Sequence, residues 1–202
     1  MKSLITFLIA MIVATPDYKP NMKEGLIIIG DSRTRDMEEV TKGISHEHVF
    51  FIAEDGQGYQ WFVNKAQGKA NDIIRSHGEI ENWIILINLG INDIMNLSSY
   101  KKEYIRLHKE EWRGHHIYVT AVNPVVPELC TSVSNFNIYQ FNEKMEEIEE
   151  AGIPFINITF FVEEHMNTKD GLHFDGETSI KIYEKYLKNI EELERKMHVE
   201  IE

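Results

Sequence analysis

The sequence of 202 residues contains one cysteine, Cys130. A single thiol cannot close an internal disulfide, and it cannot supply a CxxC metal or redox site. We expect Cys130 to be a small, partly buried apolar residue and not a nucleophile. The sequence also has no HExxH motif and no acidic cluster with metal-ligand spacing, so no metal site is expected.

Basic residues are scarce relative to acidic ones. Lysine and arginine number 21, aspartate and glutamate number 33, and the formal net charge is −12. Non-specific binding to nucleic acid or to an anionic membrane surface depends on a basic patch. The charge balance therefore indicates that nucleic acid is not a partner.

The sequence has no internal repeat, heptad array or low-complexity tract. Its length is typical of one domain, and its hydrophobic content of 43% is ordinary for a globular protein with a core. We therefore expect a single globular domain, formed by residues 21–202.

An apolar run near the N-terminus, from Leu4 to Ala14, follows Lys2 and precedes a proline-containing segment. The run is shorter than the roughly 20 residues that a membrane-spanning helix needs. It fits the apolar core of a secretory signal with cleavage after Ala14, and a first buried strand or helix is the alternative. We interpret residues 1–20 as a signal peptide, or as an N-terminal anchor, followed by a linker.

An exported bacterial chain would be secreted or would act at the cell envelope. No cysteine lies directly after the apolar run, so the attachment residue of a lipoprotein is missing. Contact with a membrane is therefore expected only through residues 1–20, and only if this segment stays uncleaved.

Five apolar runs alternate with stretches of helical spacing, and four of the runs are rich in β-branched or aromatic residues. The runs are Leu26–Ile29, Val49–Ala53, Trp83–Leu89, Ile117–Val122 and Pro154–Ile158. Strands that alternate with helices predict βαβ units, in which helices cover both faces of a parallel sheet. The first run has no polar residue in alternate positions, as expected of a strand buried on both faces.

Helical spacing of apolar residues marks the segments between these runs. Phe141, Met145 and Ile148 predict a helix over 139–150. A C-terminal stripe has the same spacing and consists of Ile180, Tyr183, Leu187, Ile190 and Leu193. Two further helices are expected over residues 71–76 and 100–112.

Polar residues follow the predicted strands at their carboxyl ends, where the functional crevice of an open α/β sheet lies. The segments there are Gly30-Asp31-Ser32, Gly56-Gln57-Gly58, Gly90-Ile91-Asn92-Asp93, Asn123-Pro124 and Asp170-Gly171-Leu172-His173. Together they provide a serine, several glycines, an asparagine, and an acid three residues before a histidine. Acyl transfer by a serine needs these parts.

Each part has a separate chemical task. The hydroxyl of Ser32 is a weak nucleophile and needs a base, which His173 can provide. The second imidazole nitrogen needs an acceptor that fixes its tautomer and orientation, and Asp170 is near enough in sequence to supply it. The N–H of Ser32, the N–H of a glycine in the second loop and the side-chain amide of Asn92 would stabilise the oxyanion.

The blocks GDSRT, GQGYQW, LGIND and DGLHFD resemble, in order and spacing, the four sequence blocks of the SGNH hydrolases, also called the GDSL family. The resemblance extends from about Gly25 to Leu187, and AVNPV at 121–125 is similar to a segment of a bacterial, often exported subgroup. It implies an α/β fold, a three-layer α/β/α sandwich similar to flavodoxin with about five parallel strands. It also implies ester hydrolysis without a metal or cofactor.

By this resemblance Ser32 is the nucleophile, His173 is the acid–base residue and Asp170 is its orienting acid. Asn92 and Gly58 match the asparagine and glycine of the family's oxyanion hole. The first block reads GDSR in place of GDSL, at a position that varies among relatives, so the chemistry is not affected.

The second block is shorter than is usual in the family, which leaves two glycines as candidates for the oxyanion hole. We prefer Gly58 to Gly56, because Gly58 directly precedes an apparent helix start. A free N–H at that point would be directed into the crevice.

Three residues near the strand ends are candidate substrate contacts. Arg33 could bind an anionic group, and a solvated arginine at a helix start is the alternative. Tyr59 could stack on a sugar ring, with packing beneath the second helix as its alternative, and Asn123 could line the pocket. Asp31 and Asp93 are expected to support the loops through hydrogen bonds to the backbone.

The sequence thus predicts a serine esterase that removes a small acyl group, most plausibly acetyl, from a carbohydrate or cell-envelope glycan. A lipase- or thioesterase-like acyl hydrolase is the nearest alternative, although the loops show no apolar lid insertion. A non-catalytic glycan-binding module is another alternative, which would not require the full set of reactive residues. A flavodoxin-like cofactor protein is disfavoured, because the first loop has no phosphate-cradling run of glycine, serine and threonine.

Overall fold

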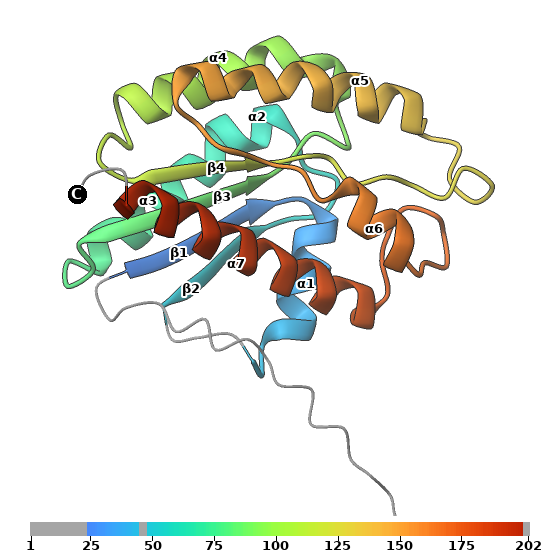
Figure 1. Ribbon diagram of the computed structural model, residues 1–202, viewed down its shortest axis with the longest axis horizontal. Helices are drawn as coiled ribbons and strands as arrows, with labels where there is room; N and C mark the ends of the chain where they lie inside the picture. The colour runs from blue at the N-terminus through green and yellow to red at the C-terminus, as the bar shows by residue number, and fades with distance from the viewer. Residues whose placement is uncertain (1–23, 45–47, 200–202) are drawn as a thin grey trace, which may run out of the picture.

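The computed structural model describes residues 24–44 and 48–199, and residues 1–20, interpreted as an export segment, lie outside this part (Figure 1). Five parallel strands form one sheet with the order β2-β1-β3-β4-β5. The strands are β1 (Glu24–Gly30), β2 (Val49–Ala53), β3 (Asn82–Asn88), β4 (His116–Thr120) and β5 (Phe155–Ile156). Each of the five predicted strands is present.

Helices cover both faces of the sheet, as the uninterrupted apolar run of the first strand predicted. Ile27 and Ile29 of β1 pack in one cluster of buried residues, whereas Leu26 and Ile28 pack in a second cluster on the opposite face. All four residues are at most 1% exposed. A strand with no solvent-facing side is stabilised by apolar residues at every position, which accounts for the missing alternation.

The helices divide between the two faces. One face carries α2 (Tyr59–Trp61), the π-helical segment η1 (Phe62–Ala66), α3 (Gln67–Ser76), α4 (Leu97–Lys109) and α5 (Asn135–Glu146). The other face carries α1 (Ser32–Thr41), α6 (Thr159–His165) and α7 (Gly176–Val199), and α7 crosses in front of the sheet in Figure 1. The 3₁₀ segments are η2 (Ile94–Asn96) and η3 (Glu147–Ala151). This arrangement is the predicted three-layer sandwich.

The predicted helices are present, but their ends differ from the predicted bounds. α5 begins at Asn135, four residues before the expected start, because the side chain of Ser134 caps it by accepting a hydrogen bond from the Asn137 N–H at 3.2 Å. α3 and α4 also begin three or four residues early. α6 was not predicted, since its seven residues are too few for a periodic apolar pattern. None of the described helices is long and apolar enough to cross a membrane.

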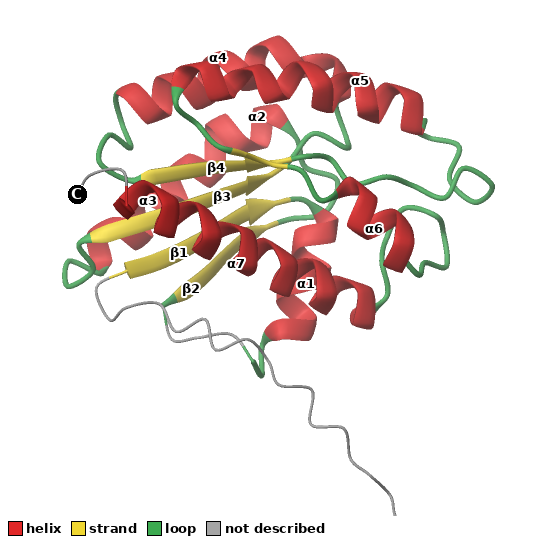
Figure 2. Ribbon diagram, viewed as in Figure 1, coloured by secondary structure: helices red, strands yellow, loops and turns green. Residues whose placement is uncertain are grey.

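The strand order fixes the place where a ligand would bind. β2 lies next to β1 at one edge of the sheet, and the chain then crosses to β3, which lies on the other side of β1. Such a reversal is the topological switch point at which open α/β sheets bind ligands. Figure 2 shows the arrowheads of the strands directed to one end of the sheet, so the loops after β1 and β3 meet there.

Candidate active site

The turn after β1 presents Ser32 at the start of a helix. β1 ends at Gly30 and α1 begins at Ser32, with Asp31 as the N-cap residue. The Oδ1 atom of Asp31 accepts a hydrogen bond from the Arg33 N–H at 3.0 Å, which satisfies one free donor of the first turn. A Cβ on Gly30 would collide with the side chain of Thr34, so only glycine lets the helix fold back so closely on the strand end.

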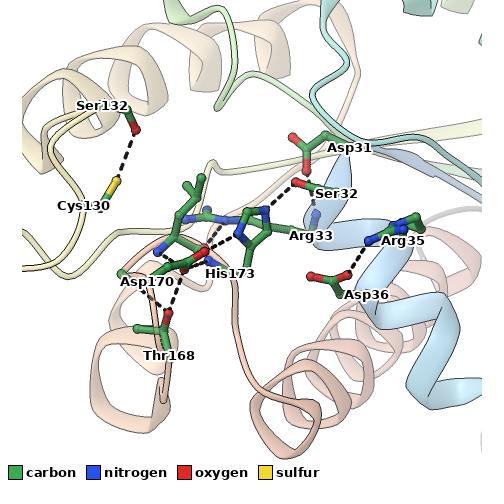
Figure 3. A network of polar contacts seen from close by, with 12 residues as sticks. Asp31, Ser32, Arg33, Arg35, Asp36, Cys130, Ser132, Thr168, Asp170 and His173 are labelled. Atoms are coloured by element: carbon green, nitrogen blue, oxygen red, sulfur yellow. Dashed lines mark hydrogen bonds and ion pairs between the residues drawn. The ribbon is translucent and has the colours of Figure 1, made fainter.

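His173 lies between Ser32 and Asp170 (Figure 3). Its Nε2 atom is 2.9 Å from the Oγ of Ser32, and its Nδ1 atom is 2.7 Å from the Oδ2 of Asp170. The structure therefore brings together the three residues that the sequence predicted as nucleophile, base and orienting acid. Ser32 is 9% exposed and the His173 side chain 37% exposed, so both can be reached from solvent.

The turn that carries Asp170 holds its carboxylate in a fixed position. Its Oδ1 atom accepts hydrogen bonds from the N–H groups of Leu172 and His173, at 2.9 and 2.8 Å. The hydrogen bond from the His173 ring is the main cause that holds the pKa of Asp170 well below its usual range. An ionised carboxylate only accepts hydrogen bonds, so Nδ1 of His173 carries the proton and Nε2 accepts the hydroxyl proton of Ser32.

A second carboxyl group, that of Asp31, lies beside the nucleophile and is buried. Asp31 is 2% exposed, and burial raises its pKa from 3.8 to about 6. The positive charge of Arg33 and the hydrogen bond from its backbone N–H oppose this effect without cancelling it. The same hydrogen bond confirms the predicted supporting contact of Asp31 with the backbone.

Asn92 lies in the same cavity as Ser32 and His173. One N–H of its side-chain amide donates to the carbonyl oxygen of Gln57 at 2.9 Å. An amide nitrogen carries two hydrogens, so the second N–H stays available for another acceptor. The hydrogen bond to the neighbouring loop fixes the plane of the amide and hence the direction of this second donor.

The two candidate glycines of the second loop differ in their surroundings. Gly56 lines the cavity. Gly58 is the N-cap residue of α2, as expected, but a Cβ there would collide with the carboxylate of Asp93. Asp93 accepts hydrogen bonds from the Tyr59 N–H at 2.7 Å and from the Tyr100 hydroxyl at 2.6 Å, which confirms its predicted support of the loops. Of the two candidates, Gly56 lines the cavity and Gly58 directly precedes α2, and Gly58 stays the predicted oxyanion donor.

Ser32 and His173 open into a cavity of about 370 Å³, a volume within the ~300–1,000 Å³ of small-molecule sites. The lining residues are Ser32, Arg35, Asp36, Asp55, Gly56, Asn92, Leu172 and His173. Arg35 forms ion pairs with Asp55 at 2.6 Å and with Asp36 at 3.3 Å, so three charged side chains form part of the wall. Within the ranges that the structure describes, no group of three or more His, Cys, Asp and Glu side chains is placed to hold a metal ion.

The structure corrects the prediction that Arg33 contacts the substrate. Arg33 is 7% exposed, and its guanidinium donates three hydrogen bonds to backbone carbonyl groups. The acceptors are Leu172 (2.9 Å from Nε), Asn123 (2.7 Å from Nη1) and Pro124 (3.2 Å from Nη2). The helix turns this side chain towards the interior, where three of its five N–H donors bond to backbone carbonyl groups.

Tyr59 and Asn123 were also predicted as substrate contacts, and the structure places both elsewhere. The ring of Tyr59 packs edge-on against Tyr100, with 5.3 Å between the ring centroids. Asn123 is 3% exposed, and its amide donates to the hydroxyl of Tyr186 at 3.0 Å. The packing alternative considered for Tyr59 is therefore the observed one.

Sequence reasoning missed the cavity-lining residues Arg35, Asp36, Asp55 and Leu172. A signal for two of them was present, because Arg35 and Asp36 follow Ser32 by three and four residues. Residues at this spacing lie on one face of a helix. Cys130 is buried, at 6% exposure, in agreement with the prediction that it is a small apolar residue.

No family model matches the sequence, and no curated protein sequence matches it. Solved structures do match. A GDSL-like lipase from Bacteroides thetaiotaomicron is 17% identical, with a TM-score of 0.63 over 87% of this chain and 89% of that one. An acetyl xylan esterase is 12% identical, with a TM-score of 0.59 over 82% and 99% of the two chains. The C-terminal catalytic domain of peptidoglycan O-acetyltransferase A from Streptococcus pneumoniae is 19% identical, with a TM-score of 0.54 over 84% and 92%.

These similarities establish the fold. The chain has the α/β/α fold of the GDSL-like hydrolases, which is the fold that its four sequence blocks indicated. Identities of 12–19% show a shared fold and no more, so an activity follows only from the geometry of the site.

Replacement of Asp31 by Asn would measure what the buried carboxyl group costs the folded state. Asparagine is an equally good N-cap residue, so the start of α1 is kept. A pKa raised from 3.8 to about 6 corresponds to about 3 kcal/mol once the group is ionised. Because the folded pKa is the higher one, the stabilisation by the bound proton is complete below about pH 4 and is lost as the pH rises through about 6.

We therefore expect Asp31→Asn to gain up to about 3 kcal/mol in free energy of unfolding over wild type between about pH 4 and pH 7. Urea unfolding of both proteins at matched pH values measures this difference, and other titrating groups cancel in it. A difference that stays constant across the range would show that the carboxyl group is not perturbed.

Proposed function

We propose that the chain is a serine esterase that hydrolyses a small acyl ester through an acyl-enzyme on Ser32. The observation that carries the proposal is the line of hydrogen bonds from Ser32 Oγ to His173 Nε2, at 2.9 Å, and from His173 Nδ1 to Asp170, at 2.7 Å. Ser32 and His173 open into the cavity at the switch point of the sheet. A glycan-binding module would not need these three side chains in hydrogen-bond contact.

Acylation begins when the Oγ of Ser32 attacks the carbonyl carbon of the ester. Nε2 of His173 takes the hydroxyl proton as the new C–O bond forms. The ionised Asp170 stabilises the imidazolium that results and keeps its orientation. Collapse of the tetrahedral intermediate breaks the bond to the alcohol, and His173 returns the proton to this leaving group.

The carbonyl oxygen becomes negatively charged in this step and needs donors that are already in place. The N–H of Ser32 lies in the first turn of α1, where N–H groups have no partner within the helix and the helix dipole favours negative charge. The second N–H of the Asn92 amide and the N–H of a glycine in the second loop, Gly58 or Gly56, are the other donors in this proposal.

Deacylation repeats the same proton transfers with water. His173 removes a proton from a water molecule, and the hydroxide adds to the acyl carbon. The second tetrahedral intermediate expels the Oγ of Ser32, which regains its proton from His173. The products are the free acid and the unmodified serine.

For the substrate we propose a small acyl group on a carbohydrate or a cell-envelope glycan. Arg35, Asp36 and Asp55 give the cavity wall charged groups that can hydrogen-bond to sugar hydroxyls. Leu172 is its one large apolar residue, so the cavity offers no apolar channel for a long acyl chain. Two of the proteins with this fold are named for acetyl groups, on xylan in one case and on peptidoglycan in the other.

A lipase- or thioesterase-like hydrolase is the second candidate. It is favoured by Leu129, which is 53% exposed although it lies against the backbone turn at Gly171. An apolar side chain at this place could contact a longer acyl chain. The names of similar structures, among them a GDSL-like lipase, are compatible with this candidate as well.

We further propose that the protein is exported, because residues 1–20 combine a lysine with a short apolar run. Glycans of the cell envelope and external polysaccharides occur where an exported protein would act. The test is the N-terminus of the protein recovered from cell fractions. A start after Ala14 in the envelope or the medium would support export, and an intact Met1 in the cytoplasm would contradict it.

The activity is tested by acid release from p-nitrophenyl acetate, p-nitrophenyl octanoate and acetylated glycans. We expect turnover of the acetyl esters, weak turnover of the octanoate, and loss of all turnover in Ser32→Ala. The substitution removes one oxygen atom, so the circular dichroism spectrum should stay unchanged. Turnover that survives in Ser32→Ala would refute the nucleophile, and a preference for octanoate would favour the lipase-like candidate.

The oxyanion role of Asn92 is tested by Asn92→Ala. Loss of one donor that acts in the transition state should lower kcat by roughly 10²-fold or more, with a small change in KM. Asn64→Ala is a matched control, because Asn64 is an exposed helical asparagine that bonds to Gln60. A change confined to KM would show that Asn92 binds the ground state instead.

A further inference from the structure

The position of His173 relative to Ser32 is not explained by Asp170. Asp170 and His173 belong to the same loop, three residues apart, so their hydrogen bond moves with the loop. Their side chains are 54% and 37% exposed, and an exposed ion pair provides little stabilisation. His173 and Ser32 are joined across the two loops by a 2.9 Å hydrogen bond. Further contacts are needed to hold the histidine loop against α1.

Arg33 contacts both chain neighbours of His173. Its Nε donates to the carbonyl oxygen of Leu172 at 2.9 Å, on one side of the histidine. Its guanidinium lies 4.7 Å from the ring centroid of Phe174, on the other side, within the range of a cation–π contact. Arg33 also directly follows Ser32 in the chain. One buried side chain therefore links the backbone of the nucleophile to the backbone of the base.

The remaining donors of Arg33 extend this link to a third loop. Nη1 and Nη2 donate to the carbonyl oxygens of Asn123 and Pro124, at 2.7 and 3.2 Å, in the loop after β4. That loop in turn holds the histidine turn, because the N–H of Val126 donates to the carbonyl oxygen of Gly171 at 2.9 Å. The guanidinium thus holds the loop of His173 in two ways. It bonds directly to Leu172, and it bonds to the loop after β4, which itself bonds to Gly171.

We propose that Arg33 is a positioning residue that sets the distance between Ser32 and His173. This inference rests on the proposed esterase function, but its geometry does not depend on the identity of the substrate. The planar fork of a guanidinium can serve three carbonyl groups in fixed directions, which an ammonium group or an apolar chain cannot do. Arg33 itself contacts no reacting atom, since its polar atoms face backbone carbonyls.

The test compares wild type with Arg33→Met, which keeps an unbranched side chain at this position and removes the guanidinium with its donors. Two controls accompany it. Arg195→Met removes an exposed arginine of α7, and Leu107→Ala opens a cavity in the core beneath α4, away from the site. Two properties are measured in the full-length chain: kcat and KM on p-nitrophenyl acetate, and the proton NMR signal of the His173 Nδ1–H.

We expect Arg33→Met to lower kcat by roughly 10- to 100-fold with KM nearly unchanged, as misplacement of a catalytic group does. The Nδ1–H signal should shift or broaden, while both controls retain wild-type kcat and signal. Wild-type kcat and signal in Arg33→Met would overturn the proposal. So would a rise in KM alone, or an equal loss of kcat in Leu107→Ala at the same melting temperature.

Two further outcomes are separable. If Arg33→Met fails to fold, Arg33→Lys keeps the positive charge, and wild-type kcat and signal in that variant would overturn the proposal. If wild type hydrolyses no ester, the esterase function fails, and the NMR signal alone still decides the role of Arg33. A signal that changes in Arg33→Met would then support positioning, and an unchanged signal would refute it.

Discussion

The burial of β1 on both faces is the constraint on which the rest of the structure depends. Helices cover Ile27 on one side of this central strand and Ile28 on the other, so neither face can carry a polar reacting group. A polar reacting group can be presented only where the chain leaves the sheet. A nucleophile delivered by β1 must therefore stand immediately after Gly30, and its partners must come from other loops at the same edge of the sheet.

Loops at that edge have irregular backbone, whose buried N–H and C=O groups need hydrogen-bond partners. Side chains provide many of them. The carboxylate of Asp93 accepts from the backbone of the second loop, Asn142 pairs with both the N–H and the C=O of Val122, and Arg33 donates to the fourth and fifth loops. Polar residues next to the reacting groups can thus be bonded to the protein and turned away from a substrate.

The strands and the reacting residues could be predicted because each depends on local pattern: apolar runs for the sheet, and residue types at strand ends for Ser32 and His173. The orientation of Arg33 could not, because its three acceptors lie 139, 90 and 91 positions away in sequence. The place of Gly56 in the wall of the cavity likewise depends on tertiary contacts that the sequence does not show. By contrast, the spacing of three residues within a helix would have been enough to predict that Arg35 lies on the same helix face as Ser32.

Stability and reactivity at this site are supplied by different groups. The exposed Asp170 fixes the tautomer of the imidazole, whereas burial around Arg33 and Asp31 fixes where the helix and the loop lie. Burying Asp31 raises its pKa to about 6 and so works against folding near neutral pH. The two large core clusters offset such a cost. Buried polar residues that support a solvent-accessible histidine are the arrangement expected where geometry must be rigid and the substrate must still enter.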